Sequence, residues 1–311
     1  VPVLAHAEWN PAGEPIPIVD CSQPAQACLD GAGGLFTFWQ EKRAVAGASV
    51  VDIVARHVLP DGSDAPGWSA AGRTIATYPS DQYVVGTLVA QADGAGGAYL
   101  FACENRYVLQ PAPTEHRLFR MRASGVLDPS WPDSGLVVGK TEHVGRPALA
   151  IDAAGGVFAG MLDWVRVTYR GLATEIVGVL ELRLTRVGPD GVVTAGWPSE
   201  GVLVHGVAPE SLLFANPSPA RMQPDSLGGV FLAWADSSGG DAVTRFWRYG
   251  PDGTAAGGWP HIGAAVSRFQ GPTAAGIPPF VSTCYVTQHK PYNEPSAGFL
   301  GLGHNAFRPM G

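Results

Sequence analysis

Charge is scarce in this sequence, and no region concentrates charge of one sign. Only 15% of the 311 residues are charged, and the formal net charge is −7. Lysine occurs only as Lys42, Lys140 and Lys290, and no run of lysine and arginine is present. A chain with this balance repels polyanions unless a local basic patch intervenes. The composition therefore argues against a nucleic-acid partner.

Long apolar runs are also absent, although 46% of the residues are hydrophobic. No stretch approaches the roughly 20 apolar residues that a membrane-spanning helix needs. The sequence begins at Val1 without an initiator methionine or a signal peptide. We therefore expect a processed protein that is secreted, extracellular or periplasmic. A piece cut from a longer chain would look the same.

Four cysteines are too few for a scaffold that depends on disulfides. Cys21 and Cys28 lie seven residues apart, close enough to bridge a short surface loop, and we predict a disulfide between them. Cys103 and Cys284 lie in apolar, strand-like runs, where we expect buried thiols. Whether these two pair is left open.

The motifs of common metal and catalytic sites are missing as well. The eight histidines show none of the spacings of zinc sites. No P-loop, dinucleotide-binding glycine motif or serine-nucleophile motif occurs in the strand-to-helix setting that gives it meaning. We expect no cofactor, with a structural Ca²⁺ ion as the one exception to test.

What the sequence does contain is a unit of about sixty residues written four times. Its first half is D-x-x-G-G before an apolar run, starting at Asp30, Asp93, Asp152 and Asp225. Its second half is a glycine turn, a tryptophan six residues later and a further glycine four residues after that. The four sets are Gly62, Trp68 and Gly72; Gly125, Trp131 and Gly135; Gly191, Trp197 and Gly201; and Gly253, Trp259 and Gly263.

Each unit consists of short apolar runs separated by Gly, Pro, Asp and Ser turns, which is the spacing of β-strands. One strand leads into D-x-x-G-G, and a second ends near an acid. After a variable loop come a third strand, a P-D-G-type hairpin and a fourth strand carrying the tryptophan. Residues 170–183 come closest to a helical pattern, and we interpret them as loop plus strand.

Four antiparallel strands per unit describe a propeller blade. The glycine and tryptophan positions resemble the DGxGG-type repeats of secreted bacterial β-propellers, over about residues 14–267. The resemblance implies an architecture and is silent on activity. We therefore expect an all-β fold, a single β-propeller domain over residues 1–311, with repeat units of about 14–77, 78–139, 140–206 and 207–267.

The two ends of the chain carry pieces of a fifth unit. Ala297 and Gly298 before FLGLGHN match the start of a second strand, and VLAHAEWNPAG matches VTRFWRYGPDG. We predict a last blade made of 268–311 plus 1–13, which would close the ring and leave no free sheet edge. The expected count is five blades, with six left open by residues 268–296.

Carboxylates recur seven residues after the second glycine of each motif, at Glu41, Glu104, Asp163 and Asp236. Equivalent blade positions lie on a circle, so these acids could bind a cation or hold a polar substrate. In an enzyme they would act as acid and as base or nucleophile on a polysaccharide. The alternative is structural, with each acid bound to backbone N–H groups or to Arg43, Arg106 or Arg166 nearby.

Variable loops follow the acids at 42–50, 105–116, 164–175 and 237–242, and all are expected on one face of the ring. Aromatic and guanidinium side chains in them suit stacking on a sugar or gripping a protein. The residues predicted to bind a partner are Arg106, Tyr107, Trp164, Arg166, Tyr169, Arg170 and Tyr292. Packing onto their own blades is the alternative.

The repeat tryptophans also allow two interpretations, sugar-binding platforms or packing between blades, and their fixed spacing to glycine favours packing. The sequence does not specify an activity. We expect a secreted binding propeller that recognises a protein partner or a glycan through the loops of one face, within a larger extracellular assembly. The alternative is a hydrolase or lyase that acts on polysaccharides with carboxylates near the propeller axis.

Overall fold

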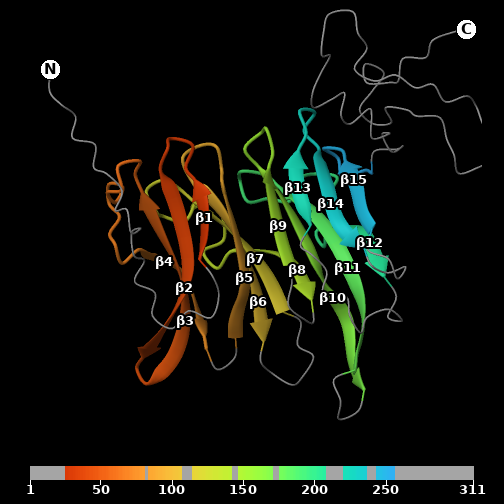
Figure 1. Ribbon diagram of the computed structural model, residues 1–311, viewed down its shortest axis with the longest axis horizontal. Coiled ribbons are helices and arrows are strands. Elements are labelled where there is room, and N and C mark those ends of the chain that lie inside the picture. Colours follow the sequence, from red (N-terminus) through yellow and green to blue (C-terminus); the bar gives the residue numbers. More distant parts are fainter. Residues whose placement is uncertain are drawn as a thin grey trace, which may run out of the picture. The chain divides into compact units, whose positions relative to one another are not determined.

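The computed structural model describes residues 25–80, 83–106, 114–141, 146–170, 175–207, 220–236 and 243–255. They form fifteen β-strands in four sheets, and within each sheet every strand pairs with the next along the chain (Figure 1). No helix occurs among these residues, and hence none that could cross a membrane. The expected all-β class is confirmed.

The first sheet contains β1 (Gln26–Leu29), β2 (Leu35–Val45), β3 (Ala48–Val58) and β4 (Arg73–Pro79). The second contains β5 (Tyr83–Ala92), β6 (Ala98–Arg106), β7 (Thr114–Met121) and β8 (Leu136–Thr141). The third contains β9 (Arg146–Ile151), β10 (Val157–Arg170), β11 (Glu175–Val187) and β12 (Val202–Val207). The fourth contains β13 (Arg221–Pro224), β14 (Val230–Asp236) and β15 (Val243–Tyr249). The first three sheets are antiparallel throughout, as predicted for the repeat unit.

The D-x-x-G-G motif forms the turn between the first two strands of a sheet. In the first sheet one carboxylate oxygen of Asp30 accepts hydrogen bonds from the backbone N–H groups of Ala32 and Gly34, at 2.7 and 2.8 Å. Gly33 has a φ of 93°, which favours a residue without Cβ. At Gly34 a Cβ would lie 2.6 Å from the carbonyl oxygen of Val58. One glycine is needed for backbone conformation, and the other for space.

Two of the segments expected to be loops are strands instead. β2 and β3 continue through residues 42–50 and are joined by a tight turn at Ala46 and Gly47, both with positive φ. Residues 164–170 are the end of β10 and pair with β11, so the expected loop at 164–175 is corrected. Polar and apolar residues alternate in WVRVTYR, which suits an extended strand. The strand expected within 170–183 is confirmed as part of β11.

The position of the repeat tryptophans is also corrected. Trp68 lies in the connection between β3 and β4, before the fourth strand rather than on it. Trp131 and Trp197 occupy the same place in the second and third sheets. These tryptophans therefore sit at the end of the sheets that carries the turns, where they can reach a neighbouring sheet.

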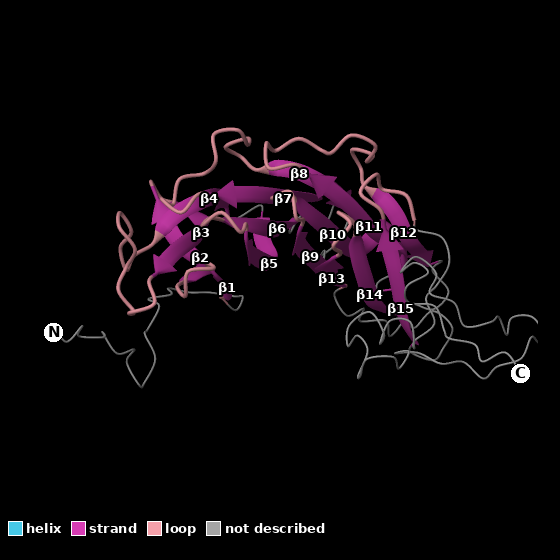
Figure 2. Ribbon diagram, turned by 90° about the horizontal axis from the view of Figure 1, so that it is seen from above, coloured by secondary structure: helices cyan, strands magenta, loops and turns pink. Residues whose placement is uncertain are grey.

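Apolar side chains fill the space between successive sheets. One core cluster joins the first and second sheets, with Phe36 and Leu100 among its buried members. A second joins the second and third sheets and includes Phe101 and Val157. The first strand of each sheet contacts the first strand of the next sheet: β1 contacts β5, β5 contacts β9, and β9 contacts β13. These four strands lie on the same side of the sheets (Figure 2).

The chain divides into two compact units, Val1–Phe246 with Pro251–Gly253, and Trp247–Gly250 with Thr254–Gly311. The first unit holds the three complete sheets. Of the second unit the structure describes only 247–250, 254 and 255, where Tyr249 pairs with Ala255. The closing blade predicted from 268–311 plus 1–13 lies outside the described residues. The single domain, the five blades and the ring closure therefore stay predictions.

Cys28 is a free thiol on β1 rather than half of a surface disulfide. It is half-buried against the core between the first and second sheets. Burial, with Asp30 and a second carboxylate adding to it, raises the pKa of Cys28 to about 12, so its thiol is unreactive. The disulfide predicted with Cys21, which lies outside the described residues, is therefore not supported. Cys103 is fully buried, as expected.

Candidate functional site

The four predicted acids all lie on the second strand of a sheet. The structure places Glu41 on β2, Glu104 on β6, Asp163 on β10 and Asp236 on β14. The second strand is one strand outward from the first strands, which contact one another. The acids therefore do not lie on the innermost strands of the sheets.

Two of these acids lie directly opposite an acid of the third strand. Glu41 pairs with Asp52 in the β2–β3 ladder, and Asp163 pairs with Glu181 in the β10–β11 ladder. Opposite residues of antiparallel strands share a face, with Cβ atoms about 4.5–5.5 Å apart. Our sequence analysis missed Asp52 and Glu181. The signal was an acid eight positions before the proline of the P-D-G turn in both units.

Asp52 is buried and held by two neighbours. Its carboxylate accepts hydrogen bonds from Nε and Nη2 of Arg43, the latter at 3.3 Å, and from the hydroxyl of Thr77 at 2.6 Å. The hydrogen bond with Asp52 raises the pKa of Arg43. Arg43 thus binds Asp52 rather than Glu41, which corrects the structural alternative for that acid. Among the described residues Glu41 has no ion pair.

Glu181 is also held by an arginine. Nε and Nη2 of Arg183 both lie 2.8 Å from Oε2 of Glu181, and Nη1 reaches the carbonyl oxygen of Gly201 at 3.5 Å. The second sheet repeats the arrangement, with Nη2 of Arg117 2.5 Å from Oε2 of Glu115. Guanidinium–carboxylate pairs of this kind fix the orientation of the carboxylate.

A groove of about 570 Å³ lies between the second and third sheets. Its lining consists of Val137, Gly139 and Lys140 from β8, Glu181 and Arg183 from β11, and Ser199 and Glu200 from the connection after β11. A volume of this size is in the range of small-molecule sites. No group of three His, Cys, Asp or Glu side chains able to hold a metal ion occurs in the part of the chain that the structure describes.

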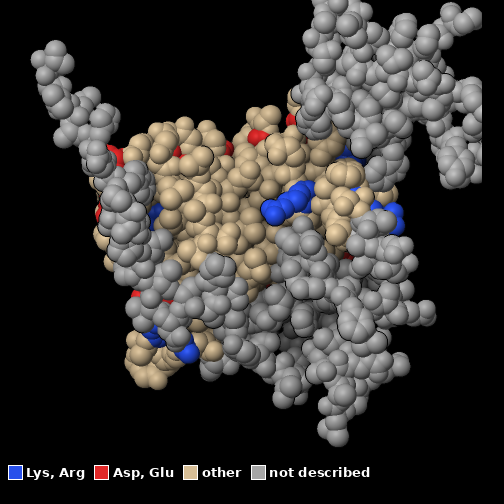
Figure 3. All heavy atoms as spheres, viewed as in Figure 1, with Lys and Arg blue, Asp and Glu red and all other residues tan. Residues whose placement is uncertain are grey.

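The lining of the groove is charged, but its charges balance. Lys140 and Arg183 oppose Glu181 and Glu200, and Lys140 is itself 3.0 Å from Glu115. Charged side chains are sparse on the face shown in Figure 3, where most of the described surface is uncharged. A neutral ligand rich in hydroxyl groups would find both donors and acceptors in this groove.

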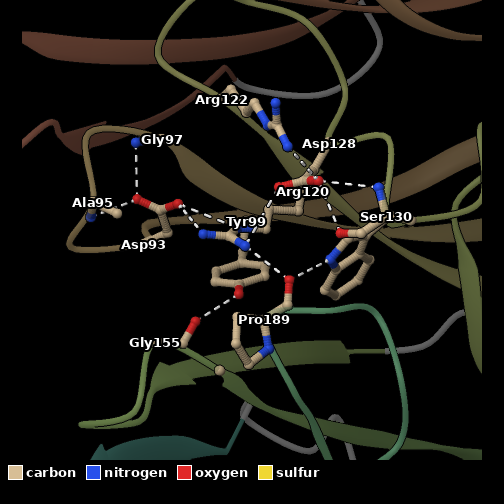
Figure 4. A network of polar contacts seen from close by, with 12 residues as sticks. Asp93, Ala95, Gly97, Tyr99, Arg120, Arg122, Asp128, Ser130, Gly155 and Pro189 are labelled. Atoms are coloured by element: carbon tan, nitrogen blue, oxygen red, sulfur yellow. Dashed lines mark hydrogen bonds and ion pairs between the residues drawn. The ribbon is translucent and has the colours of Figure 1, made fainter.

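The repeat tryptophans join neighbouring sheets and are not sugar platforms. Trp68, Trp131 and Trp197 are buried, with exposed fractions of 8%, 4% and 6%. Each indole N–H donates to a backbone carbonyl of the next sheet, and the acceptors are Ala123, Pro189 and Pro251 at 3.0, 3.1 and 2.9 Å. Figure 4 shows the Pro189 carbonyl at the centre of one such network. Packing between sheets is confirmed for these three, and Trp259 lies outside the described residues.

The residues predicted to bind a partner do not share a loop. Arg106 is the last residue of β6, and Trp164, Arg166, Tyr169 and Arg170 all lie on β10. Tyr107 and Tyr292 lie outside the described residues. Residues 164–170 thus lie on a strand rather than in a loop, and the role of these residues in binding a partner is not tested by this placement.

No protein-family model and no curated protein matches this sequence. Solved structures share a distant likeness in fold. A family 43 glycoside hydrolase, the YxiA protein of Bacillus licheniformis, is 12% identical with a TM-score of 0.36 over 70% of this chain, which spans 54% of that protein. An endo-arabinase of Bacteroides thetaiotaomicron is 14% identical with a TM-score of 0.31, over 69% of this chain and 70% of its own. A GH43 endo-arabinanase of Bacillus licheniformis is 12% identical with a TM-score of 0.30, over 80% and 79%.

The names of these similar structures reverse the order of our two functional predictions. We put a binding protein first and a polysaccharide-acting enzyme second. The similar structures are named as enzymes of the second kind, so the binding prediction is wrong on this finding and is withdrawn. At TM-scores of 0.30 to 0.36 the likeness does not establish an activity for this chain.

Proposed function

We propose that this chain is an enzyme that cleaves polysaccharides, with Asp163 and Glu181 as its two acids. The observation that carries the proposal is their direct pairing in the β10–β11 ladder, with Glu181 in the wall of the groove. In retaining glycosidases two carboxyl groups about 5–5.5 Å apart flank the scissile bond. The Cβ atoms of opposite residues in a ladder lie about 4.5–5.5 Å apart, so the carboxyl groups of such a pair can reach this separation.

The contact between Arg183 and Glu181 suggests which catalytic role each acid takes. Arg183 binds Glu181 through two nitrogens and holds its carboxylate in one orientation, as attack on the sugar requires. Glu181 is therefore the nucleophile of the proposal, and Asp163 is the proton donor to the departing sugar oxygen. Water then releases the sugar from Glu181, with Asp163 as the base.

The substrate of the proposal is an uncharged polysaccharide. The basic and acidic side chains of the groove balance, and Ser199 adds a hydroxyl group. Such a lining offers hydrogen bonds to sugar hydroxyls without selecting a charged sugar. Arabinan and mannan are sensible members of a first panel, together with other neutral polysaccharides.

The test compares Asp163→Asn and Glu181→Gln with Glu41→Gln, which changes the equivalent acid of the first sheet outside the groove. Release of reducing sugar and thermal unfolding are measured for each variant. Loss of a general acid or nucleophile is expected to lower the rate at least about 10²–10⁴-fold, with the unfolding temperature retained in Asp163→Asn. Glu41→Gln is expected to keep the rate.

Two results would overturn the proposal. One is a wild-type protein that releases no sugar from any polysaccharide of the panel. The other is activity in both Asp163→Asn and Glu181→Gln at the wild-type rate. A loss of rate that only follows a loss of folded protein would assign Glu181 to structure, because its carboxylate anchors Arg183.

We also propose that the fold is a five-bladed β-propeller whose last blade is shared by the two ends of the chain. Three complete antiparallel sheets, the contacts between successive first strands and the repeat-like terminal segments support it. A protein that lacks residues 1–13 is then expected to unfold several degrees lower than the full chain, since an open ring leaves a sheet edge unpaired. An unchanged unfolding temperature would contradict closure.

A further inference from the structure

In the first three sheets a basic residue near the end of the third strand binds the aspartate of the D-x-x-G-G turn. In the first sheet Nε2 of His57 lies 2.9 Å from Oδ2 of Asp30. In the second sheet Nη2 of Arg120 lies 3.0 Å from Asp93, and in the third Nε of Arg186 lies 2.9 Å from Asp152. These contacts lie at the end of the sheets that carries the D-x-x-G-G and P-D-G-type turns, which we call the turn end.

The arginines make a further contact that the histidine does not. Nη1 of Arg120 donates to the carbonyl oxygen of Pro189 in the third sheet at 2.8 Å (Figure 4). The indole of Trp131 donates to the same oxygen. Nη1 of Arg186 donates likewise to the Pro251 carbonyl at 2.9 Å. A charged donor makes roughly twice as strong a hydrogen bond as a neutral one. At the junction of the second and third sheets, and at that of the third and fourth, a guanidinium and an indole therefore both donate hydrogen bonds to the next sheet.

His57 leaves the junction of the first and second sheets without that bond. The carbonyl oxygen of Ala123, the equivalent acceptor, receives the indole of Trp68. The ring of His57 stacks on Phe36 at 4.0 Å, and its Nδ1 atom is buried without a hydrogen-bond partner among the described residues. An imidazole is too short to bridge Asp30 and the next sheet as a guanidinium does.

A second difference lies at the same junction. In the second sheet the hydroxyl of Tyr99 donates to the carbonyl oxygen of Gly155 in the third, at 2.7 Å. Its counterparts in the first and third sheets are Phe36 and Phe158, which have no hydroxyl, so this bond distinguishes the second junction from the other two. At the other end of the first junction a hydrogen bond joins the first and second sheets. Nε2 of the buried Gln40 donates to the carbonyl oxygen of Gly86 at 3.0 Å.

We infer that the first sheet is built to open away from the second at the turn end, with the Gln40–Gly86 bond as its pivot. The substitution of histidine for arginine makes this the weakest of the three junctions at that end, and unlike the second junction it also lacks the tyrosine bond. The device is independent of the proposed enzymatic function, because none of these residues lines the groove.

Hydrogen exchange of the full chain tests the inference. The amides of Gly34, Gly97 and Gly156 each donate to the carboxylate of their own turn, so they report opening at equivalent places. We expect Gly34 to exchange at least about tenfold faster than the other two, since its junction lacks a hydrogen bond from a charged donor. Exchange at Gly34 as slow as at Gly97 and Gly156 would overturn the inference.

A second test exchanges the basic residues of the first and second sheets and measures the same amides. His57→Arg is expected to slow exchange at Gly34, and Arg120→His to accelerate it at Gly97. Arg122→His is the matched control, because Arg122 is exposed and bonds Asp128 within its own sheet. A folded His57→Arg protein with unchanged exchange at Gly34 would contradict the role of His57. If that variant does not fold, unchanged exchange at Gly97 in Arg120→His would contradict the inference equally.

Discussion

The indole N–H of Trp131 in the second sheet donates a hydrogen bond to the carbonyl oxygen of Pro189 in the third. Trp131 is buried, and its ring lies 5.6 Å from that of Tyr99. A buried indole N–H needs an acceptor, and the turn that begins at Pro189 presents one. Because Trp68 and Trp197 make the same bond, a repeat in the sequence becomes a repeat of contacts between sheets.

Removing the bond while keeping the ring is expected to have a small effect. Trp131→Phe should lower the free energy of unfolding by about 1 kcal/mol, the net contribution of one hydrogen bond, since Arg120 still donates to Pro189. Trp131→Ala should lower it by about 3–5 kcal/mol because it leaves a cavity. Urea unfolding measures both, with the exposed Val126→Ala as control, expected within about 0.5 kcal/mol of wild type. Equal losses in the two Trp131 variants would show that the hydrogen bond, not the ring, carries the stability.

The sequence was sufficient for the elements that the repeat specifies. Asp30, Gly33 and Gly34 predict a turn because each has a local task that the structure confirms, namely capping, positive φ and close approach. The same holds for Trp68, whose spacing to glycine indicated packing between sheets. The repeat marks these positions in the sequence even though partners such as Ala123 of Trp68 are distant along the chain.

The acid pairs could not be predicted in the same way. Glu41 and Asp163 were found because they repeat along the chain, whereas the acids opposite them depend on strand register. Register follows from the length of each hairpin, and we interpreted 42–50 and 164–175 as loops. Once those hairpins are known to be long, Asp52 and Glu181 fall opposite the predicted acids.

Acid is expected to weaken the second sheet through Asp128. This buried carboxylate accepts hydrogen bonds from the backbone N–H and hydroxyl of Ser130 and from Arg122. Burial alone raises its pKa, but these bonds outweigh burial and lower the pKa of Asp128 to about 2. A depressed pKa contributes stability above the unfolded value near 3.8, and the contribution is lost as pH falls from about 4 to about 2.

The measurement is urea unfolding across that pH range. The wild-type protein should lose on the order of 1 kcal/mol through Asp128, a modest value because the partner Arg122 is exposed. Asp128→Asn should reduce the slope of stability against pH, while Asp133→Asn at an exposed site of the same connection should keep it. Identical slopes in wild type and Asp128→Asn would rule out this contribution.

The two glycines of a D-x-x-G-G turn should respond differently to substitution. Gly96 has a φ of 86°, and a Cβ there would meet only Ala123 at an ordinary 3.7 Å. Gly96→Ala is therefore expected to cost about 1–2 kcal/mol through its backbone conformation alone. A Cβ at Gly97 would collide with the carbonyl oxygen of Met121 and lie 2.9 Å from Oδ2 of Asp93.

Gly97→Ala should therefore cost more than Gly96→Ala, since backbone must move and the Asp93 carboxylate must leave its place. Asparagine separates the two causes, because it tolerates positive φ but adds bulk. Gly96→Asn should recover part of the stability lost in Gly96→Ala, while Gly97→Asn should recover none of that lost in Gly97→Ala. Thermal and urea unfolding of the four variants measure this, and a Gly97→Ala protein as stable as Gly96→Ala would show that the second glycine is not required for space.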